Sequence, residues 1–108
     1  MSETASVSEL APPQPVRSLF ADDEDFRELI ELFLSSATER IDEMPRMFAE
    51  NDLAALRVAA HQLKGSAGGY GFPGLTDLAA ELEARCIDGV TTEADVTRVT
   101  DYLRRLTA

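Results

Sequence analysis

The chain has 108 residues and a formal charge of -10, with 10 Lys and Arg against 20 Asp and Glu. This charge works against binding to nucleic acid or to anionic lipid surfaces, because both carry dense negative charge. One Cys and one His are too few for an internal disulfide or a zinc site, and no apolar run approaches the length that spans a bilayer. We therefore expect a cytoplasmic protein without a metal or a membrane segment.

The composition favours helices and one domain. Aromatic residues make up 6% of the chain and Trp is absent, whereas Ala, Leu, Glu and Arg recur. Residues 1–17 are rich in Ser and Pro and lack periodicity, which predicts a flexible arm ahead of a domain over 18–108. The segment from Val16 to Phe20 carries enough apolar residues for a short turn that caps one end of the domain.

The first predicted helix begins at the acidic run Asp22–Asp25, whose side chains can accept hydrogen bonds from the free N–H groups of a helix start. Pro45 predicts a kink or the end of the regular helix. Asn51 and Asp52 predict a turn and a new helix start. Apolar residues recur at three- and four-residue steps along this first helix, on one stripe: Phe26, Leu29, Ile30, Phe33, Ala37, Ile41, Met44 and Phe48.

Three further stretches have helical periodicity. Glycines at 68, 69 and 71 end the second helix, Asp88-Gly89 ends the third, and Thr92 with Asp95 resembles a capping box at the start of the fourth. Together these patterns predict an all-α fold, an antiparallel up-down four-helix bundle. The three stripes are Leu56, Ala60, Leu63, Ala67 and Tyr70; Leu75, Leu78, Ala79, Leu82 and Cys86; and Val96, Val99, Leu103 and Leu106.

His61, Lys64 and Gly65 lie together on the outer face of the second predicted helix. With the mean direction of its apolar stripe as zero, His61 falls at roughly 140°, Lys64 near 80° and Gly65 near 180°, at about 100° per residue. A neutral imidazole is a nucleophile at physiological pH, and Lys64 can offset the charge of a phosphoryl group. Gly65 weakens the helix, so we interpret it as a position that lets a large partner approach His61.

The run His61-Gln-Leu-Lys-Gly-Ser66, followed by Gly71, Leu75, Leu78 and Leu82-Glu83, resembles the histidine-containing phosphotransfer (HPt) domain family. The resemblance implies a four-helix bundle whose second helix is phosphorylated at Nε2 of His61. Its partners would be receiver domains, which give and take the phosphoryl group through an aspartate and supply the divalent metal, expected to be Mg²⁺. Lys64 and Gly65 match the family's charge-compensating and access positions.

Glu83 departs from the family pattern, because many members carry Gln at this position to orient the imidazole. A carboxylate at position 83 can accept a hydrogen bond from Nδ1–H of His61, which would leave Nε2 as the attacking nitrogen, but it adds negative charge near the phosphate. The resemblance also implies a carrier without its own ATP-binding or kinase site or cofactor. We expect a monomer, and either a free-standing carrier or one domain of a larger hybrid kinase.

Other functions fit the sequence less well. A histidine-kinase dimerisation helix usually has an acidic residue after its His, whereas Gln62 follows His61. A phosphoacceptor domain of a chemotaxis-type kinase would differ only in its phosphoryl donor. A helical adaptor with an incidental His61 would permit that side chain to be buried. A metalloenzyme or hydrolase is disfavoured, since the single His leaves no metal cluster and no base for Ser66.

Overall fold

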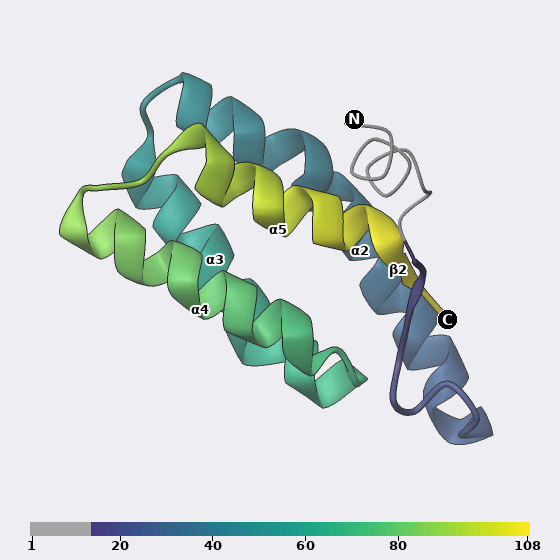
Figure 1. The fold of residues 1–108 in the computed structure, drawn as a ribbon. Helices are drawn as coiled ribbons and strands as arrows, with labels where there is room; N and C mark the ends of the chain where they lie inside the picture. Colours follow the sequence, from purple (N-terminus) through teal and green to yellow (C-terminus); the bar gives the residue numbers. More distant parts are fainter. Residues whose placement is uncertain (1–13) are drawn as a thin grey trace, which may run out of the picture.

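The computed structural model describes residues 14–108, and its main elements are four helices. They are α2 (Glu24–Ala49), α3 (Leu53–Ala67), α4 (Pro73–Asp88) and α5 (Glu93–Arg105), with a 3₁₀ turn, η1 (Gly68–Tyr70), after α3. Successive helices run in alternating directions (Figure 1). The predicted all-α bundle is therefore confirmed.

Side chains next to three of the helix starts explain where those helices begin. Asp23 caps α2 by accepting a hydrogen bond from the backbone N–H of Asp25 (3.0 Å), and Asp52 caps α3 by accepting from that of Ala55 (3.1 Å). Thr92 and Asp95 form the predicted capping box of α5. The starts of α2, α3 and α5 thus satisfy backbone N–H groups that lack partners within a helix.

The four predicted stripes meet in one core. Leu29 is the exception: the periodicity assigns it to the stripe of α2, but it is 45% exposed. The buried positions of α2 define a narrow line, and Leu29 lies about 70° from its mean direction at 100° per residue. The buried members of the core include Ile30, Phe33, Ala37 and Met44 from α2, Leu56, Ala60, Leu63 and Ala67 from α3, Leu75, Ala79 and Leu82 from α4, and Val96, Val99 and Leu103 from α5.

Two expectations about helix ends need correction. Of the two effects predicted for Pro45, the end of the helix is wrong, since α2 continues to Ala49 with the Pro45 side chain exposed to solvent, and the kink stays a prediction. The apolar stripe of the second helix extends to Tyr70, but the α-helical part stops at Ala67 and the next three residues form η1. Consecutive glycines at 68 and 69 favour this tighter turn, because they disfavour an α-helix.

The terminal segments of the described chain pair at one end of the bundle. β1 (Val16–Arg17) and β2 (Leu106–Thr107) form a two-stranded parallel sheet in which Val16 lies opposite Leu106 (Figure 1). The flexible arm predicted for residues 1–17 falls mostly outside the described residues, but its last two residues form β1. A strand pair this short leaves no period-two pattern that would predict it.

The segment after β1 is fastened to the loop that follows α3. The Ser18 hydroxyl donates to the Tyr70 carbonyl (2.6 Å), and the Leu19 N–H donates to the Gly71 carbonyl (2.9 Å). Gly71 has a φ of +88°, and a Cβ there would lie 2.3 Å from Ser18 Oγ and 2.8 Å from Leu19 N. The close approach of these two segments therefore requires glycine at position 71.

This contact predicts the effect of Gly71→Ala. The new methyl group adds a steric clash to left-handed backbone strain, so the free energy of unfolding should fall by about 2 kcal/mol or more in urea titrations. Gly89→Ala is a matched control, because Gly89 also has a positive φ (+71°) but a Cβ there would have no neighbouring atom within 4 Å. Equal losses of stability in the two variants would contradict the packing argument.

Asp95 joins the start of α5 to α4 through a buried carboxylate. It accepts from the backbone N–H of Thr92 (2.8 Å) and pairs with Arg85 (3.2 Å) and Arg98. Burial raises the pKa of the Asp95 carboxyl, but the hydrogen bonds from Thr92 and the two arginines more than offset this, so that the pKa is lowered below its ordinary value of 3.8. The carboxylate therefore stabilises the fold above that ordinary value, and its contribution is lost as the pH falls through the lowered pKa.

Asp95→Asn should consequently reduce the free energy of unfolding at pH 7 by about 1–3 kcal/mol, since it replaces the buried charged acceptor of the Thr92 N–H and of two arginines by a neutral amide. The difference from the wild type should shrink as the pH is lowered below about 4. Asp101→Asn is the control, because Asp101 pairs with Arg104 on the exposed face of the same helix and should matter by less than about 1 kcal/mol. A loss that stays constant down to about pH 2 would contradict this account of Asp95.

Candidate functional site

His61 faces away from the core of the bundle, in the direction that the helical period predicts. Its side chain is 64% exposed, while its neighbour Ala60 and the nearby Leu63 are buried and fix the rotation of α3. Burial of the apolar stripe thus directs the imidazole towards solvent. A macromolecular partner can reach the ring without any rearrangement of the helix.

Glu83 on α4 lies between His61 and Lys64 and uses one carboxylate oxygen for each. Its Oε2 is 2.8 Å from Nδ1 of His61, and its Oε1 is 2.6 Å from Nζ of Lys64. The Glu83 side chain is only 11% exposed, because it lies where α4 packs against α3. The carboxylate therefore connects the two helices at the position of the imidazole.

The contact with Glu83 selects one form of the His61 ring. An ionised carboxylate can only accept hydrogen bonds, so the proton must be on Nδ1. In the neutral ring, Nε2 then carries the free electron pair. The geometry thus leaves Nε2 as the nucleophilic nitrogen.

The charge on Glu83 is maintained by its neighbours. The hydrogen bond from Lys64 lowers the pKa of the Glu83 carboxyl below its ordinary value of 4.5; desolvation opposes this shift, and contact with His61 adds to it. Because the pKa is lowered rather than raised, Glu83 is ionised at neutral pH. The site therefore holds a carboxylate in direct contact with the imidazole of His61.

Lys64 is half-buried, at 38% side-chain exposure, and its ammonium group is bound to Glu83. The sequence predicts it on the outward face beside His61, and the structure places it there. Its partner is a carboxylate across the helix interface, which the spacing within one helix could not indicate. In this structure the positive charge of Lys64 is therefore paired with the carboxylate of Glu83.

Gly65 is exposed, and a Cβ at this position would have no neighbouring atom within 4 Å. Packing within the protein therefore does not require glycine here. Gly68 differs, because a Cβ at that position would lie 3.3 Å from the Thr76 hydroxyl. The open surface at Gly65 is next to His61, one helical turn further along α3.

One contact near the site was not predicted from the sequence. A guanidinium nitrogen of Arg40 on α2 donates to the Gln62 side-chain oxygen (2.6 Å), directly beside His61 in the sequence. Arg40 lies 22 residues before Gln62, and neither the motif nor the periodicity connects them. The contact ties α2 to the outer face of α3.

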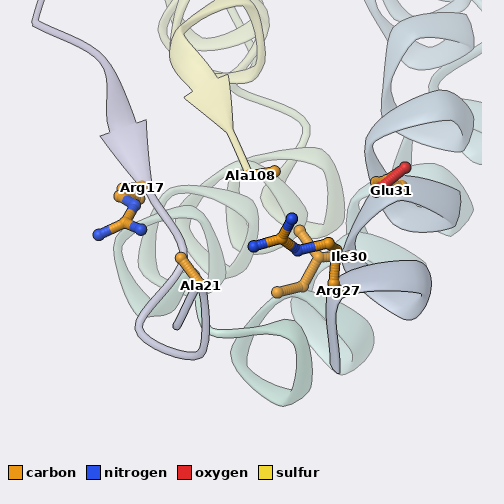
Figure 2. Close-up of a pocket in the computed structure, with 6 residues that line it drawn as sticks. All are labelled: Arg17, Ala21, Arg27, Ile30, Glu31 and Ala108. Carbon is orange, nitrogen blue, oxygen red and sulfur yellow. The ribbon is translucent and has the colours of Figure 1, made fainter. Parts of the chain in front are cut away.

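The His61 imidazole lies on an open surface rather than in a cavity. A cavity of about 210 Å³ is lined by residues of β1, the following turn and α2, together with Ala108, and none of the site residues contributes to it (Figure 2). Among residues 14–108, no cluster of His, Cys, Asp and Glu side chains could hold a metal ion. None of the helices in this part of the chain combines the length and apolar character needed to cross a bilayer.

One of three comparisons with known proteins found a match. The family model described as Hpt domain matches residues 28–108, which include all four helices in whole or in large part and every residue of the site. A search of curated proteins and a search of solved structures found no significant match. The family match covers well over half of the chain, and on this evidence the chain belongs to the Hpt domain family.

Proposed function

We propose that this chain is a phosphorelay intermediate that accepts a phosphoryl group on His61 from a receiver-domain aspartate and passes it to another receiver. Hpt domains take part in phosphotransfer in two-component signalling. The observation that carries the finer proposal is the exposed imidazole of His61, whose Nδ1 is 2.8 Å from the Glu83 carboxylate. A phosphoryl carrier needs an accessible nucleophile, and a proton held on Nδ1 leaves Nε2 free for that role.

The proposed step is a direct displacement at phosphorus. The electron pair of Nε2 forms the new N–P bond, the bond between phosphorus and the aspartate oxygen breaks, and the aspartate leaves as a carboxylate. Lys64 would offset charge on the phosphoryl oxygens, and Glu83 would hold the ring in the orientation for attack. The divalent metal, expected to be Mg²⁺, belongs to the receiver.

The chain would act as a carrier rather than as a kinase. Its sequence carries no Gly-rich nucleotide-binding pattern. Its own residues would therefore position the imidazole and the phosphoryl group rather than bind ATP. We expect it to work in the cytoplasm as a monomer that docks receiver domains. A helical adaptor with an incidental His61 is disfavoured by the exposure of that side chain and by its pairing with Glu83.

The direct test uses a phosphorylated receiver domain, Mg²⁺ and the chain, followed by detection of an acid-labile, base-stable phosphoryl group. Because the chain has one His, such a label identifies His61. His61→Gln should abolish the label while circular dichroism shows the same helical content. Label retained in that variant would contradict the assignment, and label obtained only from ATP and a kinase domain would instead favour a chemotaxis-type phosphoacceptor.

The Gly65→Ala substitution should change the stability of the fold and the rate of phosphoryl transfer in opposite directions. The added methyl group meets no atom of the protein and improves helix propensity, so the free energy of unfolding should rise by about 0.5–1 kcal/mol. Transfer from the receiver should nevertheless slow by about tenfold or more, since the methyl group displaces the docked partner from His61. Gly69→Ala is the control, with equally free space around it but further from His61 along the chain. An unchanged rate in Gly65→Ala would remove Gly65 from the docking surface.

A further inference from the structure

Both oxygens of the Glu83 carboxylate have partners in the unphosphorylated site. A phosphoryl group on His61 would therefore compete with Glu83 for Lys64. Oε1 binds Lys64 at 2.6 Å and Oε2 binds Nδ1 of His61 at 2.8 Å. A phosphoryl group on Nε2 would bring about two negative charges next to the same lysine. Lys64 then has two anions within reach.

We propose that Lys64 changes partner when His61 is phosphorylated, moving from Glu83 towards the phosphoryl oxygens, and that Glu83 thereby controls how readily the phosphoryl group leaves. This inference rests on the proposed function of His61 as the phosphoryl carrier. In the proposed function Glu83 orients the ring and Lys64 compensates charge, each on its own. The inference adds that the two residues act as a pair, whose exchange of partners controls release of the phosphoryl group.

The two partners differ in their freedom to move. Glu83 is almost fully buried between α3 and α4, while Lys64 is 38% exposed and carries its charge on a flexible four-carbon stem. Lys64 lies one helical turn after His61, so its ammonium group can reach either side of the imidazole. The structure therefore identifies Lys64 as the group that moves and Glu83 as the group that stays.

The charges balance in this exchange. When Nε2 attacks phosphorus, the neutral ring with its Nδ1 proton becomes an imidazolium that carries both the proton and the phosphoryl group. The departure of Lys64 leaves the full charge of Glu83 to pair with that imidazolium through the existing Nδ1 contact. The phosphoryl oxygens receive the ammonium group in return, so that no charge in the site is left without a partner.

The exchange has a consequence for the next transfer. A phosphorylated imidazolium releases its phosphoryl group readily, because the leaving group is neutral imidazole; loss of the Nδ1 proton would make the leaving group an imidazolate anion. Glu83 keeps that proton in place and also competes with the phosphoryl group for Lys64. Both effects make the phosphorylated form more reactive, which suits a carrier that passes the group on.

The test measures the half-life of phosphorylated His61 in four proteins: the wild type, Glu83→Gln, Lys64→Ala and the double variant. The chains are loaded with phosphoramidate, a small chemical donor that phosphorylates exposed histidines, so the measurement does not depend on finding the natural receiver. Glu81→Gln is the matched control, since it makes the same substitution on the exposed face of α4, where Glu81 contacts Arg98 (3.7 Å). Imidazole ¹⁵N shifts report whether the proton remains on Nδ1.

Glu83→Gln should keep the Nδ1 proton in the unphosphorylated ring, since the amide oxygen still accepts, and should lengthen the half-life by about fivefold, the effect expected of one charge interaction. Lys64→Ala should shorten the half-life, and more so in the Glu83→Gln background, where Lys64 has no competing carboxylate. Glu81→Gln should match the wild type.

An unchanged half-life in Glu83→Gln would overturn the inference, as would an equal effect of Lys64→Ala in both backgrounds. Neither result would affect the proposed function, which is tested separately by transfer from a phosphorylated receiver. Conversely, a receiver that never phosphorylates His61 would count against the relay even if the loaded chain shows the expected coupling between Lys64 and Glu83.

Discussion

The site depends on one buried carboxylate that two helices bring to the imidazole. Glu83 is held at the packing surface between α3 and α4, and its two oxygens contact His61 and Lys64 at 2.8 Å and 2.6 Å. Since the carboxylate remains charged, it fixes the proton on Nδ1 and presents Nε2 to solvent. The register of α4 against α3 is therefore as important for the chemistry as the motif around His61.

The remainder of the fold maintains that register. Ser18 and Leu19 fasten the N-terminal segment to Tyr70 and Gly71, and so fix the loop that leads from α3 to α4. Asp95 binds α5 to α4 through Arg85 at the opposite end of α4. Polar contacts thus hold α4 near both of its ends, while the apolar core supplies most of the stability.

Periodicity in the sequence was enough to predict the four helices, their core stripes and the outward direction of His61. It was not enough for Leu29, at the edge of a stripe, or for β1 and β2, whose pairing is made by backbone groups alone. The motif indicated His61, Lys64 and Gly65 because they lie within two turns of one helix. The pairing of Lys64 with Glu83 depends on how two helices pack, which no spacing within one helix reveals.

We infer that Glu83 leaves Nε2 as the only nucleophilic nitrogen of His61. The most direct measurement is a ³¹P–¹⁵N NMR experiment on the ¹⁵N-labelled chain after phosphoryl transfer from a receiver, because it identifies the ring nitrogen bonded to phosphorus. We expect coupling of phosphorus to Nε2, with the proton retained on Nδ1. Phosphorus bonded to Nδ1 would contradict it, since that nitrogen would then have lost its hydrogen bond to Glu83.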